Sequence, residues 1–376
     1  IEGNDLATFP DFPAEIRAPA GTTFGVSAFQ INFGARKIMT SGDQLDVLVA
    51  MNPAALITNL ADVKPGGIVI ADSGAFTDRN LSKAGYEQNP LDDDSLEGYR
   101  LVKIDMSRLT VEAVKEFGLS NKEGLRSKNM WALGLIYWMY GRKRQASVDW
   151  LNKKFASKPD IANSNIAALN AGHAFGETAE MPAELGTFEV EKAAIAPGVY
   201  RTITGAESVS LGMLAGSQLA GLNISFCSYP ITPASALLHH LARMKDFGVM
   251  TFQAEDEIAA VSAALGASYA GALGVTSSSG PGIALKMEAI GLAIATELPM
   301  VIVNSQRAGP STGLPTKTEQ SDLYQAVYGR NADAPMPVIS VSTPSDGYDV
   351  AIEAVRIATK YMTPVMLLTD GYITNA

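Results

Sequence analysis

The sequence predicts an α/β protein of two domains, the second of which is built on a doubly wound parallel sheet. Short apolar runs alternate with helical patterns along most of the chain, as expected of strand–helix units. Most of these runs are apolar throughout, which is typical of parallel strands buried on both faces. With 376 residues, the chain is long enough to bury two separate cores.

Residues 1–155 are expected to form the first domain. Its predicted strands are residues 25–33, 46–51, 68–71 and 101–104. Its predicted helices are residues 52–60, 109–117 and 129–140. A Lys-Pro-Gly-Gly turn at 64–67 leads into the third strand. The last helix is apolar nearly all round, so we expect it to be buried.

Residues 156–200 are predicted to be an interdomain linker. The periodic patterns weaken there, and residues 157–165 are polar with one proline. Residues 177–197 are acidic, alanine-rich and bounded by proline. Such compositions are typical of linkers.

Residues 201–376 return to a regular alternation of strands and helices. The predicted strands are residues 223–227, 248–252, 273–276, 299–304, 338–341 and 365–369. The predicted helices are residues 208–220, 234–245, 257–272, 283–296 and 345–360. This succession predicts a parallel sheet covered by helices on both faces.

Charge and cysteine content exclude several classes of function. The net charge of −10 argues against a nucleic-acid partner. No apolar run approaches the roughly 20 residues that cross a bilayer, and the first residues are polar, so we expect a cytoplasmic protein. Cys227 is the single cysteine, whereas an iron–sulfur cluster needs about four thiolates. Any such cluster would belong to another polypeptide.

Four predicted strands of the second domain end in polar or glycine-rich segments. These segments are YPITPAS at 229–235, QAEDE at 253–257, TSSSGPG at 276–282 and QRAGPSTGLPT at 306–316. Ligands of parallel α/β sheets gather beyond the carboxyl ends of the strands. We therefore expect Thr232, Glu257 and Arg307 to open toward one cleft at this edge.

Glu257 is the first candidate catalytic residue. Glu255, Asp256 and Glu257 could simply be acids of a first helical turn, where the helix dipole favours them. Glu257 differs because an apolar helical face follows it, made of Ile258, Val261, Ala264 and Leu265. An acid that begins a buried face needs a polar partner.

Thr232 and Arg307 also admit two interpretations. Thr232 is predicted to cap a helix with Pro233 in its first position, and a helix start can also hold a carboxylate. Arg307 stands where a strand leaves the core, and such an arginine is usually solvated. Its guanidinium nevertheless suits bidentate carboxylate binding.

Other candidate sites have weaker support. Residues 277–282 could be an ordinary tight turn, since they lack the lysine of a phosphate-binding loop and the GxGxxG pattern. The three histidines, His173, His239 and His240, cannot form a metal triad because the last two are adjacent and face different sides of a helix.

In their order and spacing, the segments YPITPAS, QAEDEIAA, SSGPG with Met287-Glu288 behind it, and QRAGPSTGLPT with Gln320 and Asp322 behind it resemble one family. This family is the α subunit of 2-oxoacid:ferredoxin oxidoreductases, thiamine-diphosphate enzymes that oxidise 2-oxoacids to acyl-CoA. Residues 29–31, 46–52 and 64–67 resemble the γ domain that some members carry ahead of the α domain. The resemblance covers nearly the whole chain, and it leads us to expect further segments at both ends.

The resemblance implies a thiamine pyrimidine-binding role for the second domain. The matching glutamate, Glu257, would hydrogen-bond N1′ of the aminopyrimidine and so assist removal of the C2 proton. Pro230 and Ile231 would lie beside the cofactor.

The resemblance also implies a substrate site. Thr232 and Arg307 would hold the carboxylate of the 2-oxoacid. Lys317 is a further candidate, for a second, distal carboxylate. Residues 310–316 would form a loop over the substrate.

The implied activity is oxidative decarboxylation of 2-oxoglutarate to acyl-CoA and CO₂, with electrons passed to ferredoxin. The β subunit would hold the diphosphate, Mg²⁺ and the iron–sulfur cluster, so no metal is expected on this chain. Branched-chain 2-oxoacids and pyruvate stay open as substrates. Alternatives are a non-catalytic binding module that keeps the fold, or another thiamine enzyme, although the GDG…N metal motif of those enzymes is missing.

Overall fold

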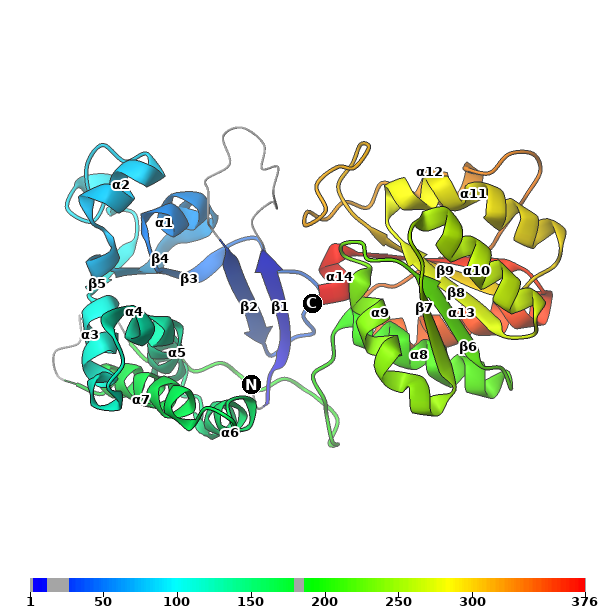
Figure 1. Ribbon diagram of the computed structural model, residues 1–376. Coiled ribbons are helices and arrows are strands. Elements are labelled where there is room, and N and C mark those ends of the chain that lie inside the picture. Colours follow the sequence, from blue (N-terminus) through cyan, green and yellow to red (C-terminus); the bar gives the residue numbers. More distant parts are fainter. Residues whose placement is uncertain (1–2, 12–26, 179–185, 376) are drawn as a thin grey trace. The chain divides into compact units, whose positions relative to one another are not determined.

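The computed structural model describes residues 3–11, 27–178 and 186–375. The chain divides into two compact units, which are described separately. Unit 1 comprises Ile1–Ala7 and Gly21–Ala196, and unit 2 comprises Thr8–Ala20 and Pro197–Ala376. In both units, helices flank a parallel sheet (Figure 1). Within the described ranges, no helix combines the length and the apolar character that a membrane span requires.

Unit 1 contains a three-stranded parallel sheet in the order β3-β4-β5. The strands of this unit are β2 (Ala28–Gly34), β3 (Leu45–Ala50), β4 (Val63–Asp72) and β5 (Arg100–Ile104), while β1 (Asp5–Asp11) runs across the division between the units. The helices are α1 (Pro53–Asn59), α2 (Asp78–Ala84), α3 (Met106–Ala113), α4 (Asn121–Gly124), α5 (Lys128–Met139), α6 (Gln145–Lys154) and α7 (Pro159–Gly176). Side chains of β4 alternate between two apolar clusters, Ile68 and Ile70 with α5, and Val69 and Ala71 with α1.

The linker predicted for residues 156–200 was wrong in its first part, because Pro159–Gly176 forms the 18-residue helix α7. This helix packs so closely on α5 that a Cβ on Gly172 would lie 1.8 Å from the carbonyl oxygen of Trp131. Its small residues give almost no apolar periodicity. Packing against α5, α6 and α3 stabilises the helix, and these contacts leave no periodic signal in the sequence.

Unit 2 contains a six-stranded parallel sheet in the order β10-β11-β9-β8-β6-β7. Its strands are β6 (Ile224–Ser228), β7 (Val249–Gln253), β8 (Leu273–Ser278), β9 (Met300–Gln306), β10 (Val338–Ser340) and β11 (Pro364–Asp370). Its helices are α8 (Gly205–Leu219), α9 (Ser235–Leu241), α10 (Glu257–Tyr269), α11 (Gly280–Ala295), α12 (Leu323–Tyr328), α13 (Asp346–Tyr361) and α14 (Gly371–Asn375).

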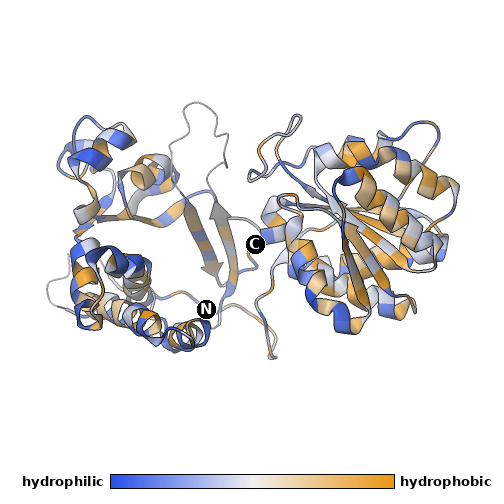
Figure 2. Cartoon of the chain, viewed as in Figure 1, coloured by the Kyte–Doolittle hydropathy of each residue, from blue (hydrophilic) through white to orange (hydrophobic). Residues whose placement is uncertain are grey.

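Two apolar clusters cover the two faces of this sheet. One unites the sheet with α8, α9 and α13, and the other unites it with α10 and α11. Apolar residues occur both along the strands and along the helices that cover them (Figure 2), and the strands β6, β8, β9 and β11 are buried at every position. The predicted doubly wound parallel sheet is therefore confirmed, with helices on both faces.

Glycine is required where α8 approaches α13. A Cβ on Gly212 would lie 2.2 Å from the carbonyl oxygen of Tyr348, whereas a Cβ on Gly266 of α10 would meet no atom within 4 Å. We expect Gly212→Ala to lower the free energy of unfolding by about 1–3 kcal/mol through overpacking. Gly266→Ala should raise it by about 0.5–1 kcal/mol, because alanine loses less backbone entropy. Chemical denaturation of both variants checks this, and equal stability of the two would contradict the packing.

Candidate cofactor and substrate site

The site lies at the carboxyl edge of the unit 2 sheet. The neighbouring strands β9, β8, β6 and β7 run parallel and end there at Gln306, Ser278, Ser228 and Gln253. The chain reverses its direction of winding between β6 and β8, since β7 lies on one side of β6 and β8 on the other. Ligands of open α/β sheets bind at such a switch point.

The side chains of Ser278, Tyr229 and Glu257 form a row of hydrogen bonds at the switch point, called the Tyr229 chain below. The Tyr229 hydroxyl donates to Oε1 of Glu257 at 2.8 Å and lies 2.7 Å from Oγ of Ser278. A phenol has a single proton, so when Tyr229 donates to Glu257, Ser278 donates to Tyr229. Burial raises the pKa of Tyr229, and the Glu257 charge raises it further. Tyr229 therefore stays a protonated donor at neutral pH.

The three consecutive acids at the start of α10 have separate roles. Asp256 is the N-cap and accepts the backbone N–H of Ala259 at 2.8 Å, as the helix-start interpretation predicted. Glu257 is half-buried and turns to Tyr229, and no hydrogen bond reaches its second oxygen, Oε2, from the described residues. Oε2 is thus available to a ligand.

The apolar face predicted behind Glu257 is only partly buried. Val261 and Ala264 are fully buried, but Ile258 is 55% exposed. The prediction for Ile258 was wrong because Ile258 lies on the outer face of α10, in line with the exposed Ser262 and Tyr269.

Gly282 makes room for the Tyr229 chain. A Cβ at this position would lie 2.1 Å from Oγ of Ser278, 2.4 Å from the Tyr229 hydroxyl and 2.9 Å from Cγ of Glu257. The glycine-rich segment is therefore more than a turn. It belongs to the first turn of α11, which begins at Gly280, three residues earlier than predicted.

Arg307 is buried, with 7% of its surface exposed, so the interpretation as a solvated arginine was wrong. Its Nη1 donates to the carbonyl oxygen of Thr232 and its Nη2 to that of Thr312, each at 2.9 Å. Its Nε is buried without a partner among the described residues. Burial lowers the pKa of Arg307, while the nearby Tyr229 and Glu257 oppose this shift.

Thr232 does not cap a helix, which corrects the prediction. Helix α9 begins only at Ser235, because the Ser235 hydroxyl accepts the N–H of Ile231 at 2.8 Å and closes a turn ahead of the helix. Thr232 is exposed, and its carbonyl oxygen accepts hydrogen bonds from Arg307 and Ser279.

A cavity of about 570 Å³ adjoins Arg307. Its other lining residues come from the start of α11, from the loop that follows β9 and from the start of α12: Gly280, Pro281, Ala284, Gly309, Pro310, Ser311, Glu319, Ser321, Asp322 and Gln325. Thr232 and Glu257 are absent from this lining, so the three predicted residues lie at one edge but do not line one cavity. Hydrogen bonds link Thr232 to Arg307, and Glu257 to Tyr229.

The remaining predicted site residues lie close by in sequence but differ in environment. Ile231 packs against the small cluster around Tyr229, and Pro230 is exposed. Lys317 is half-buried in the loop after β9, where its backbone N–H donates to the carbonyl oxygen of Leu314. Lys317 is not among the residues that line the cavity.

Comparison with known proteins places this geometry in a family. Residues 1–175 match the family described as pyruvate ferredoxin/flavodoxin oxidoreductase, and residues 216–376 match its thiamine-diphosphate-binding domain. The chain carries two domains of the 2-oxoacid:ferredoxin oxidoreductase family. The predicted resemblance is thereby confirmed.

Relatives and a solved structure extend this similarity along the whole chain. The 2-oxoglutarate oxidoreductase subunit KorA of Mycobacterium tuberculosis is 55% identical over 99% of this chain and 57% of its own length. The 2-oxoglutarate synthase subunit KorA of Archaeoglobus fulgidus is 47% identical over 42% of this chain and 46% of its own length. The 2-oxoglutarate:ferredoxin oxidoreductase of Magnetococcus marinus, solved with 2-oxoglutarate, coenzyme A and succinyl-CoA, is 32% identical with a TM-score of 0.78 over 99% of this chain and 59% of that chain. The chain therefore spans less than two thirds of the length of each.

No role was predicted from the sequence for Tyr229, Ser278 or Lys286 of this domain. Tyr229 and Ser278 belong to motifs that were singled out, but their contact depends on two strands adjacent in the sheet and separated by β7 in sequence. Lys286 carried a signal that could have found it. It is one of two charged residues in the otherwise apolar and glycine-rich segment 280–295.

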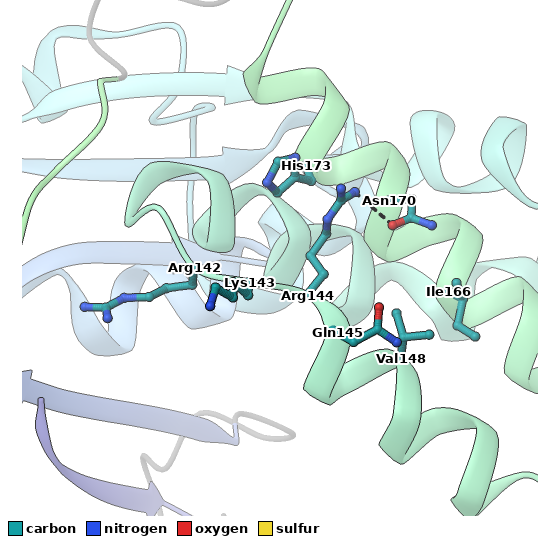
Figure 3. A pocket seen from close by; sticks show the side chains of 8 residues that line it. All are labelled: Arg142, Lys143, Arg144, Gln145, Val148, Ile166, Asn170 and His173. Atoms are coloured by element: carbon teal, nitrogen blue, oxygen red, sulfur yellow. Dashed lines mark hydrogen bonds between the residues drawn. The ribbon is translucent and has the colours of Figure 1, made fainter. Parts of the chain in front are cut away.

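Unit 1 holds a second cavity, of about 510 Å³ (Figure 3). It is lined by Arg142, Lys143, Arg144, Gln145, Val148, Ile166, Asn170 and His173. Arg144 is held by Asn170, to which it donates a hydrogen bond of 2.9 Å. Because its lining includes three cations and no carboxylate, the cavity suits an anion better than a cation.

Proposed function

We propose that this chain is the γ- and α-domain part of a 2-oxoglutarate:ferredoxin oxidoreductase subunit that decarboxylates its substrate oxidatively. The observation that carries the proposal is the Ser278–Tyr229–Glu257 chain at the switch point of the sheet. It presents a carboxyl group whose Oε1 is held by Tyr229 and whose Oε2 is open to a ligand. The similarity to KorA subunits supports 2-oxoglutarate as the substrate.

The residues at the switch point fit thiamine diphosphate. Oε2 of Glu257 is open to a ring nitrogen, and Gly282 leaves out the Cβ that would displace Tyr229 and Ser278. When bound, the cofactor supplies a nucleophilic carbon and an electron sink for the decarboxylation. Glu257 would hold a proton between Oε2 and N1′, while Tyr229 keeps Oε1 as an acceptor. Pro230 and Ile231 would lie beside the cofactor ring.

The substrate carboxylate would bind beside Thr232 and Arg307, which are already joined by a hydrogen bond. A guanidinium has five N–H donors, and hydrogen bonds to the carbonyl oxygens of Thr232 and Thr312 use two of them. The buried, unpartnered Nε supplies a further donor. These backbone contacts orient Arg307 before substrate arrives, and Lys317 would hold the distal carboxylate.

Electron transfer would require another polypeptide. Cys227, the chain's single cysteine, is buried, so we propose that a β subunit holds the iron–sulfur cluster, the diphosphate and Mg²⁺. Ferredoxin would then accept the electrons, and coenzyme A would accept the acyl group.

Co-expression of the full-length subunit with its β partner tests the proposal. The assembled enzyme should reduce ferredoxin in the presence of coenzyme A and 2-oxoglutarate. If pyruvate or a branched-chain 2-oxoacid is turned over faster than 2-oxoglutarate, the assigned substrate is wrong but the assigned reaction class still holds. An assembled complex that binds thiamine diphosphate but turns over no 2-oxoacid would favour the non-catalytic binding module.

A further inference from the structure

Lys286 is a fully buried lysine beside the Tyr229 chain. None of its surface is exposed, and its Nζ donates to Oγ1 of Thr276 at 2.9 Å. Nζ also lies 5.4 Å from the centroid of the Tyr229 ring, within the distance at which a cation is attracted to an aromatic face. No carboxylate of the described residues forms an ion pair with it.

Burial of this ammonium costs stability. An ammonium has three donors, and Lys286 makes a single hydrogen bond within the described parts of the chain. Desolvation lowers the pKa of Lys286 to about 8, against the opposing effects of Glu257, Cys227 and Asp256. Glu257 and Asp256 face it from the start of α10 and Cys227 from β6, while the residues of β9 and β11 in the same cluster are apolar, namely Met300, Ile302, Met366 and Leu368.

A methionine at this position would fill similar space without a charge to desolvate. Replacing buried charged groups by apolar ones of similar volume is often neutral or stabilising. Lys286 is therefore poorly explained by packing alone. Strongly perturbed ionisable groups cluster at functional sites, and Lys286 lies over the ring of the same tyrosine that donates to Glu257.

We propose that Lys286 is a positioning residue that acts through Tyr229 on Glu257. Its ammonium over the ring holds Tyr229 in place and withdraws electron density from the phenol, which makes the hydroxyl a stronger donor to Oε1 of Glu257. The proton that Glu257 exchanges is thereby kept on Oε2, the oxygen that is open to a ligand. This inference rests on the proposed function.

The test compares Lys286→Met and Lys286→Arg in the full-length subunit assembled with its β partner. Lys360→Met is the matched control, because Lys360 lies 5.3 Å from the ring of Tyr361 but is exposed and belongs to α13, on the opposite face of the sheet from α11. The first measurement is the exchange rate of the C2 proton of bound thiamine diphosphate as a function of pH. The second is the melting temperature of the complex across the same pH range.

We expect wild-type exchange to slow above about pH 8, where Lys286 loses its proton. In Lys286→Met, the C2 proton should exchange at least about tenfold more slowly at pH 7 than in wild type. Its exchange rate should show no further decrease above pH 8. Lys286→Arg should keep most of the wild-type exchange rate. This rate should also not decrease above pH 8, since a guanidinium stays charged. The proposal would be overturned if Lys286→Met exchanged the C2 proton at the wild-type rate and with the wild-type decrease above pH 8.

The melting temperatures separate this role from a structural one. The folded pKa of Lys286 lies below its ordinary 10.5, so the unfolded chain binds more protons between about pH 8 and 10.5 and stability rises with pH there. Lys286→Met should have a higher melting temperature than wild type at pH 7, and the difference between the two melting temperatures should become smaller above pH 8. A variant that melts lower at every pH and exchanges normally would show a purely structural lysine. If the wild-type complex itself does not exchange the proton, the proposed function is wrong and this inference falls with it.

Discussion

Replacing Glu257 with glutamine should slow exchange of the C2 proton of bound thiamine diphosphate by about 10²–10⁴-fold, the usual contribution of a general acid–base group. The glutamine carbonyl oxygen can still accept the Tyr229 hydrogen bond, which measures 2.8 Å in the structure. The amide cannot give or take a proton at N1′. The expected loss therefore concerns proton transfer and leaves the fold unchanged.

Proton–deuterium exchange of the assembled enzyme, followed by NMR, measures this effect directly. Glu255→Gln is a suitable control, because Glu255 is an exposed acid two residues earlier and makes no hydrogen bond within the described parts of the chain. Equal exchange rates for the two variants would return Glu257 to the role of an ordinary acid at a helix start.

Replacing Arg307 with lysine should raise KM for every 2-oxoacid by about ten- to a hundredfold, the equivalent of about 1.5–3 kcal/mol for a hydrogen bond to a charged group. Lysine keeps the charge but loses the planar fork. It cannot hold the carbonyl oxygens of Thr232 and Thr312 together, as Arg307 does with two hydrogen bonds of 2.9 Å. The substrate carboxylate would then lose the bidentate guanidinium, and the turn at Thr232 would lose its hydrogen bond to Arg307.

Lys317→Ala provides the contrast in steady-state kinetics. If Lys317 holds the distal carboxylate, this variant should raise KM for 2-oxoglutarate and leave KM for pyruvate unchanged, because pyruvate has no second carboxylate. Equal losses for both substrates would make Lys317 a loop residue and move the choice of substrate elsewhere. A KM for Arg307→Lys that matches wild type would remove Arg307 from the substrate site.

The sequence alone predicted the sheet of unit 2 because its strands are short, apolar and regularly spaced between helices. Each of β6, β7, β8 and β9 starts and ends within two residues of the prediction. The central strands β6, β8 and β9 are buried on both faces and so contain apolar runs, whereas the edge strand β7 is mostly exposed and was found by its spacing between two helices. The same runs located the polar strand ends, and with them Thr232, Glu257 and Arg307.

Tertiary structure alone decided which groups meet at those ends. The strand order brings β8 beside β6, and this places Ser278 and Tyr229 in contact across 49 positions of sequence. It also buries Lys286 behind the tyrosine ring. Helix α7 follows the same rule, because the close approach of its small residues to the backbone of α5 depends on the folded chain. Apolar periodicity is local and can be read along the chain, whereas a hydrogen bond or a close helix contact depends on neighbours that only the folded chain supplies.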